Sequence, residues 1–137
     1  MRRSSGRRRA DRSGESGAST VEMAMYMPIL LFIIFTTVQF ALVYLGNQAA
    51  SAVARESARV ARTSDGDVAA GERAGYQYAA NIGQGILNDV DVNVVPVAGN
   101  RVRAVVSGRA QELSPVLVPR VSQTVEGPIE EFRQDTP

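Results

Sequence analysis

The stretch Met23–Leu45, MAMYMPILLFIIFTTVQFALVYL, decides the fold of this chain of 137 residues. No charged side chain occurs between Met23 and Ala54. A helix of about 20 apolar residues crosses the hydrocarbon core of a bilayer, so the sequence predicts a transmembrane segment over about residues 23–45. The apolar core of a secretory signal peptide has only about 7–15 residues, which favours a retained helix over a cleaved signal.

The charges on either side of the apolar stretch predict its orientation. Six arginines precede Gly17, against two acidic residues. Because positive charge next to a span stays in the cytoplasm, we expect a single pass through the cytoplasmic membrane with the N-terminus inside and the C-terminal domain outside. Arg55, Arg59 and Arg62 weaken this bias without reversing it. The arginine-rich head has no interleaved aromatic residues, so nucleic acid is not an expected partner.

Helical character continues beyond the span. The segment GNQAASAVARESARVARTS has many alanines and no proline, and the first break comes at Ser64-Asp65-Gly66. A helix from about Thr20 to Arg62 would be about 60 Å long, twice the hydrocarbon thickness, so its outer half must project from the membrane. Four alanines share one side of this half at helical spacing: Ala50, Ala54, Ala58 and Ala61. They could pack against another helix or against the chain's own domain, or this part could be a solvated helix with arginines that face lipid, and these alternatives stay open.

A second helix is expected from about Gly66 to Leu87, capped by Ser64 or Asp65. Apolar residues recur in it at spacings near 3.6 and predict one buried face: Val68, Tyr76, Ala79, Ile82 and Ile86. Four glycines weaken the helix, and they also allow a neighbouring element to approach closely.

The last third of the sequence alternates between apolar and polar residues, which predicts strands. One apolar row holds Val90, Val92 and Val94, and a second holds Val102, Ala104 and Val106. A two-residue turn at Gly99-Asn100 would put these rows on different faces, so we expect a loop of about five residues, Pro96–Asn100, or a bulge near Val95-Pro96. Arg101 and Arg103 are the expected surface partners of Asp89 and Asp91. A third strand should start after Pro119, at about Arg120.

The predicted fold class is therefore α+β, with a long N-terminal helix followed by one helix and a short antiparallel β-meander. We expect an arginine-rich cytoplasmic leader at residues 1–17, the long helix at 18–62 and a small exported domain at 63–137. A domain of about 75 residues buries little surface, so the end of the long helix is expected to supply part of its core.

Catalytic and metal-binding chemistry finds little support in the sequence. The chain has no Cys and no His, which removes thiolate ligands and the commonest general base near neutral pH. Glu130 and Glu131 are adjacent and so do not converge on one substrate. The glycine-rich piece NIGQGI lacks the lysine of a phosphate-binding loop. We expect no enzyme, no catalytic residue, no metal site and no cofactor.

The residues before the span resemble a known processing signal. A basic head, then Gly17-Ala18-Ser19-Thr20-Val21-Glu22, then an apolar helix is similar to the class III signal peptide of type IV pilin-like proteins. In that family a membrane-embedded prepilin peptidase cuts after the glycine. The resemblance implies cleavage between Gly17 and Ala18, and it makes Glu22 the fifth residue of the mature chain.

The following segment narrows the resemblance. MPILLFIIFTTVQFALVYLGNQAASAVARESARVAR resembles the N-terminal region of TadE-like pseudopilins, minor components of the tight-adherence (Flp, type IVb) pilus. Pro28 and the segment Arg55–Arg59 carry this likeness, which extends over about Gly17 to Arg62 and is only architectural beyond. Met23 follows Glu22, where the major Flp pilin typically has Tyr, and this departure favours a minor subunit.

The resemblance implies a pseudopilin that takes part in pilus assembly and adhesion and is incorporated in a surface pilus. Its implied partners are the prepilin peptidase, other pilin or pseudopilin subunits, the assembly machinery and the lipid bilayer. The amine of Ala18, freed by cleavage, lies one helical turn from Glu22. Glu22 can pair with this amine in its own chain, with that of a neighbouring subunit, or face water at the membrane surface.

Pro28 removes one helix hydrogen bond and crowds the carbonyl of Ala24, so it should kink or loosen the span. Membrane helices often tolerate a proline, and the alternative is that the loosening eases extraction of the subunit into a filament. Two other functions also remain: a signal-anchored membrane protein whose exported domain binds a partner without such processing, and a secreted domain released near Ala52–Ala54.

Overall fold

The computed structural model describes residues 13–63, 67–82, 85–113 and 119–130; for residues 13–16 and 18 it describes only the backbone. These residues form two helices and three strands, in the order α1 (Ser13–Thr63), α2 (Val68–Ile82), β1 (Leu87–Val97), β2 (Arg101–Ala110) and β3 (Arg120–Pro128). The chain divides into two compact units, one ending at Thr36 and one beginning at Thr37. The α+β class is confirmed.

The long helix is confirmed as one continuous element of 51 residues that includes Pro28. It begins seven residues before the predicted Thr20 and ends one residue after the predicted Arg62. Its last residue, Thr63, turns its hydroxyl back toward the helix, where Oγ1 donates a shared hydrogen bond to the carbonyls of Arg59 (3.1 Å) and Val60 (3.2 Å). The helix thus ends close to the break that the Ser64-Asp65-Gly66 sequence predicts.

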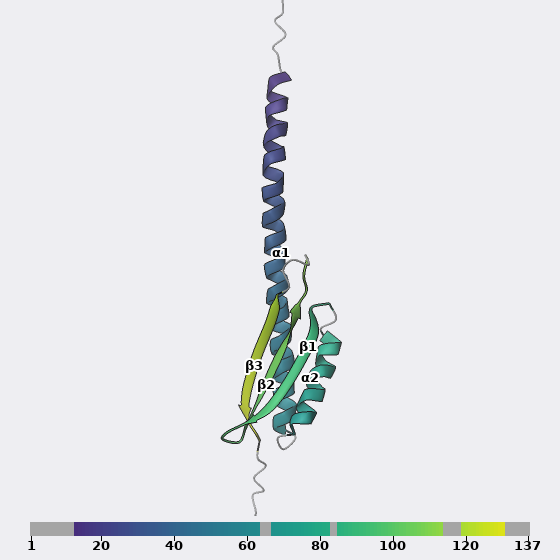
Figure 1. Ribbon diagram of the computed structural model, residues 1–137, viewed down its shortest axis with the longest axis vertical. Helices are drawn as coiled ribbons and strands as arrows, with labels where there is room; N and C mark the ends of the chain where they lie inside the picture. Colours follow the sequence, from purple (N-terminus) through teal and green to yellow (C-terminus); the bar gives the residue numbers. More distant parts are fainter. Residues whose placement is uncertain (1–12, 64–66, 83–84, 114–118, 131–137) are drawn as a thin grey trace, which may run out of the picture. The chain divides into compact units, whose positions relative to one another are not determined.

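The second unit contains an antiparallel sheet with the strand order β1-β2-β3 (Figure 1). Val92 pairs with Val106 and Val94 with Ala104, so the two apolar rows share one face, as the alternation predicts. The connection is shorter than expected: Val97 pairs with Arg101, which leaves a three-residue turn at 98–100. Gly99 and Asn100 adopt positive φ angles of 85° and 55°, which suit glycine and asparagine. The register shift lies between Asn88 and Asp91, not at Val95-Pro96.

Strand β3 starts at Arg120, as predicted. The ion pairs across the sheet differ from those expected. Arg103 and Glu126 are opposite each other across β2 and β3, and Glu126 binds both Arg103 and Arg101. Asp89 pairs with Arg109 instead. The prediction was wrong because the sequence does not say which neighbour of the central strand carries the carboxylate.

Both helices cover the same face of the sheet. A methyl group built on Gly46 of α1 would lie 2.7 Å from the Cβ atom of Ala110 in β2. One built on Gly75 of α2 would collide with Ser57 of α1 and lie 2.8 Å from Val92 of β1. The contacts show that α1, α2 and the sheet meet around small side chains, with no space for larger ones at these points.

The second helix differs from its prediction in length, cap and buried face. It ends at Ile82, and Leu87 already belongs to β1. Asp67 caps it by accepting a hydrogen bond from the Ala70 N–H (3.1 Å), while the expected caps, Ser64 and Asp65, lie outside the described residues. Its buried residues are Gly71, Gly75 and Ala79, and of the expected face only Ala79 is among them. Tyr76 is 45% exposed.

Candidate assembly site on the long helix

The N-terminal part of α1 positions the residues of the expected processing and pairing site. Gly17 and Glu22 are both exposed, and the helix is continuous through Ala18. Residues four apart on a helix lie on the same face, one turn from each other, so Glu22 lies on the face that Ala18 begins. A methyl group added at Gly17 would meet nothing within 4 Å. The site is therefore open on the surface of this unit.

The unit that ends at Thr36 exposes an apolar surface along α1. Large apolar side chains from Val21 to Phe35 are between about half and three quarters exposed, for example Met25 (69%) and Phe32 (73%). The helix is long and apolar enough to cross a membrane by length and composition. An exposed surface of this kind is unfavourable in water and favourable in lipid, so the protein is membrane-anchored.

The second half of α1 belongs to the unit that begins at Thr37, and its alanine face is buried there. Ala50, Ala54 and Ala61 are fully buried, and Ala58 is 2% exposed. These residues are part of the core that includes Val53 of the same helix and the inward valines of the sheet. The alanine face therefore packs on the chain's own domain, and Gly71 of α2 lies against Ala61 of this face.

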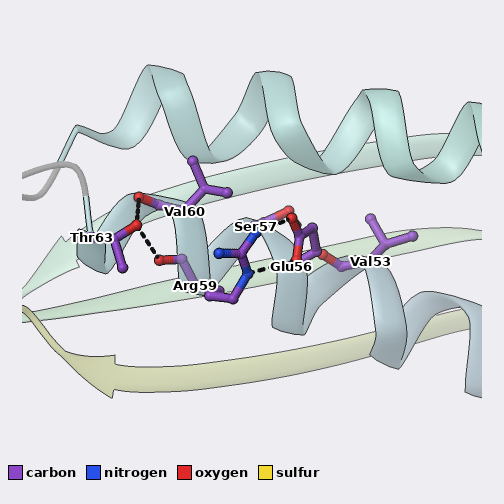
Figure 2. Close-up of polar contacts among 6 residues, drawn as sticks. All are labelled: Val53, Glu56, Ser57, Arg59, Val60 and Thr63. Carbon is purple, nitrogen blue, oxygen red and sulfur yellow. Dashed lines mark hydrogen bonds and ion pairs between the residues drawn. The ribbon is translucent and has the colours of Figure 1, made fainter.

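A buried hydroxyl lies on α1 where Gly75 of α2 approaches it. Ser57 has no exposed surface, and its Oγ donates a hydrogen bond to the carbonyl of Val53 (2.9 Å), as Figure 2 shows. Serine within a helix commonly satisfies its hydroxyl in this way. The bond keeps the hydroxyl within the turn of its own helix, beside Gly75, and avoids the cost of an unpaired polar group in the core.

On the outer side of the same turn, Glu56 and Arg59 form a bidentate ion pair (Figure 2). Arg59 Nε donates to one carboxylate oxygen of Glu56 (2.9 Å) and Nη2 to the other (2.6 Å). The hydrogen bond from Arg59 and the attraction of its charge lower the pKa of Glu56, although partial burial acts in the opposite direction. The same partner raises the pKa of Arg59.

Two further contacts tie α1 to the sheet and to the segment after β2. Gln123 of β3 donates to the side-chain oxygen of Asn47 (3.0 Å). The Leu113 N–H donates to Gln39 Oε1 (3.1 Å). Sequence reasoning missed both, because these residues are more than 70 positions apart and no local pattern relates them. The Glu56–Arg59 pair, by contrast, has the i, i+3 spacing of a readable helical pair.

The described residues contain no group of three or more His, Cys, Asp or Glu side chains that could hold a metal ion. A hollow of about 290 Å³ is lined by residues at the end of β2 and the start of β1, among them Asn88, Arg109 and Glu112. Arg109 pairs with Asp89 there, which makes it a structural cation at the edge of the sheet. We derive no reaction from this arrangement.

The fold and the exposed helix define a class: a membrane-anchored protein with a small α+β unit built on the second half of its anchor helix. Residues 17–59 match the family model described as TadE-like protein, so this part of the chain is TadE-like. The match confirms the resemblance found in the sequence, and it covers less than half of the chain. Neither a curated protein nor a solved structure matches the chain.

Proposed function

We propose that the protein is a minor pilin of a tight-adherence pilus, processed between Gly17 and Ala18 by a prepilin peptidase. One observation carries the proposal: the TadE-like match begins at residue 17, the glycine after which the resemblance places the cut. The mature chain then starts at Ala18 and retains the whole apolar surface of α1. In this role the protein takes part in pilus assembly and adhesion.

The proposed role of Glu22 follows from the electrostatics of a membrane. Cleavage creates an ammonium group at Ala18, one helical turn from the Glu22 carboxylate. An isolated carboxylate in hydrocarbon is costly, so pairing with an amine is favourable for both groups. When the amine belongs to a neighbouring subunit, the pair also sets the axial register, because a mispaired neighbour leaves a charge buried.

Two features of α1 support recruitment into a filament. Its apolar side chains before Thr37 are exposed, so they are free to exchange lipid for the helices of other subunits. Pro28 lies inside this segment and lacks the N–H that would bond the carbonyl of Ala24. In our proposal the weaker helix at Pro28 eases extraction of the subunit from the bilayer.

The second candidate function is a signal-anchored protein with a partner-binding domain and no prepilin-type processing. The same exposed helix serves it equally well, since any single-pass anchor needs such a surface. The two functions differ at the N-terminus of the mature chain.

The test is the intact mass and N-terminal residue of the protein from cells with and without the prepilin peptidase. The proposal expects a chain starting at Ala18 in the first case and the unprocessed chain in the second. An N-terminus that does not depend on the peptidase would favour the anchored protein. A start near Val53 or Arg55 would indicate a secreted domain and overturn both.

A further inference from the structure

One end of the sheet lies beside the part of α1 that leads into the span. Leu87 pairs with Ala110, and Arg109 pairs with Arg120, so the start of β1, the end of β2 and the start of β3 are together at this end. Gly46 of α1 is next to it: a methyl group built there would be 2.7 Å from the Ala110 Cβ and 3.7 Å from the Ile86 carbonyl oxygen.

From Ala110 the chain follows α1 toward the apolar segment. The Gln111 N–H donates to the carbonyl of Ile86 (3.2 Å), and the Leu113 N–H donates to Gln39 Oε1 (3.1 Å). Gln39 precedes Gly46 by seven residues, which is about 10 Å along a helix. The segment 110–113 therefore runs along α1 by about that distance and is held at both ends by hydrogen bonds.

The position of Gln39 along α1 indicates how deep in the membrane it lies. A span of about 20 residues that begins after Glu22 ends near Leu42, so Gln39 is in its last turn on the domain's side. Tyr44, 63% exposed, follows at the position where tyrosine is favoured, the boundary between lipid and water. Leu113 is bound to Gln39 and shares its level, and half of its surface (49%) is exposed.

We propose that Leu113 and Ile86 form a second membrane contact of this protein, in the leaflet on the domain's side. We call these two residues the rim. Leu113 enters the boundary of the acyl chains beside Phe40, which is 72% exposed, and Ile86, 36% exposed, lies at headgroup level. Gln39 accepts the backbone N–H of Leu113, which would otherwise lose water as its partner on immersion.

Charges of both signs lie near the rim: Arg109 is paired with Asp89, and Glu112 precedes Leu113. Arg120, at the start of β3, is exposed at this end of the sheet and has no ion pair with the described residues. Cationic side chains at headgroup level attract the phosphates of lipids. The rim requires only that the protein is membrane-anchored, so it holds whether or not the chain is processed or enters a pilus. Its consequence is that the domain is fixed in orientation on the bilayer by two contacts.

Because the chain has no cysteine, a single introduced cysteine can be labelled without background. The full chain is reconstituted in phosphatidylcholine vesicles as Leu113→Cys, carrying an environment-sensitive fluorophore. Phe40→Cys provides the reference within the span, and Thr124→Cys provides an exposed reference on the outer face of the sheet. Quenching is measured with nitroxide-labelled lipids and with aqueous iodide.

The label at 113 should resemble that at 40: quenched by the lipid nitroxide and at least threefold less accessible to iodide than the label at 124. Ile86→Cys, a second probe in case position 113 perturbs folding, should give intermediate quenching by both agents. Iodide quenching at 113 and 86 equal to that at 124 would overturn the proposal. So would protection that appears only at high protein-to-lipid ratio, since it would indicate a second copy of the chain as the occupant.

Discussion

At the scale of single residues, the packing of the domain depends on positions where only hydrogen fits. Gly75 of α2 faces both Ser57 of α1 and Val92 of β1, so three elements meet at a residue that has no side chain. Glycine costs about 1 kcal/mol of helix propensity relative to alanine. Glycine is favoured here because the close packing of α2 stabilises the domain by more than this helix-propensity cost.

Gly75→Ala should therefore destabilise the protein by about 1–3 kcal/mol, although alanine is the better helix former, because the added methyl group overlaps its neighbours. Thermal unfolding of the full chain in detergent, followed by far-ultraviolet circular dichroism, measures the change. Gly17→Ala is the matched control: its methyl group meets nothing within 4 Å, and the midpoint should not fall. An unchanged midpoint for Gly75→Ala would show that α2 shifts without cost.

Glu22 is the residue on which the proposed assembly depends. Glu22→Ala should leave processing largely intact and reduce incorporation into pili by more than about tenfold, because removing one partner of a buried ion pair costs roughly 3–5 kcal/mol. Immunoblots of sheared pili and membranes measure the two effects together, with Met23→Ala as the control in the same turn. Equal incorporation of Glu22→Ala and the unchanged chain would remove the register role.

At the scale of elements, the sequence predicts best where one simple pattern acts alone. Between residues 29 and 63 of α1 there is no proline, and that uninterrupted apolar and alanine-rich run places its C-terminus within one residue. The face of α2 was mispredicted because glycine counts as neither apolar nor large, yet Gly71 and Gly75 are what the helix buries. A pattern of hydrophobic residues does not reveal close contacts that are possible only because glycine has no side chain.

The strands show the same division. Alternation correctly put Val92, Val94 and Val106 on one face, because the face depends only on whether the positions are odd or even along each strand. It did not give the turn length, since three-residue and five-residue loops have the same parity. The partner of Arg103 depends on which strand lies beyond β2, and only the fold answers that. Of the candidate site, the sequence supplies Gly17, Ala18 and Glu22; their roles remain predictions.

The Glu56–Arg59 pair gives a prediction about pH. The pKa of Glu56 is lowered in the folded chain, so the pair stabilises the protein above the ordinary pKa of a glutamate, and the benefit is lost as pH falls through the lowered value. Glu56→Gln should thus be less stable than the unchanged chain at pH 7, by about 0.5 kcal/mol or less because the pair is partly exposed to solvent. The difference should vanish once the pH is low enough to protonate the carboxyl in the folded chain.

Thermal midpoints of both chains across this pH range test the expectation. Arg55→Gln serves as the control, since Arg55 binds the hydroxyl of Ser51 and, among the described residues, forms no ion pair with a carboxylate. A difference between Glu56→Gln and the unchanged chain that persisted at the lowest pH would mean that Glu56 acts through packing and not through its charge.

At the scale of the whole molecule, the boundary between the two units falls within α1, at Thr36 and Thr37. One helix is thus the membrane anchor over its first half and a core element of the domain over its second. Val53, Ala54 and Ala58 of this second half are part of the domain's core.

Truncation tests this division. A chain that begins at Gly46 retains the buried half of α1 and should unfold cooperatively in water. A chain that begins at Asp67 lacks that half, exposes the inner face of the sheet and should not fold, because a sheet and one short helix bury too little apolar surface. Urea titrations followed by circular dichroism distinguish the two. Cooperative unfolding of the shorter chain would show that the long helix is dispensable for the domain.

The small size of the buried side chains has a thermodynamic consequence. Among the described residues, the largest fully buried side chains are valines, and the exposed ones include Phe32, Phe40, Tyr44 and Tyr76. The heat capacity of unfolding grows with the apolar surface that becomes hydrated, about 12–15 cal/mol/K per residue in ordinary domains. A core of alanine, glycine and valine releases less such surface. The stability curve of this domain should therefore be flat, with little change in the free energy of unfolding between cold and warm surroundings.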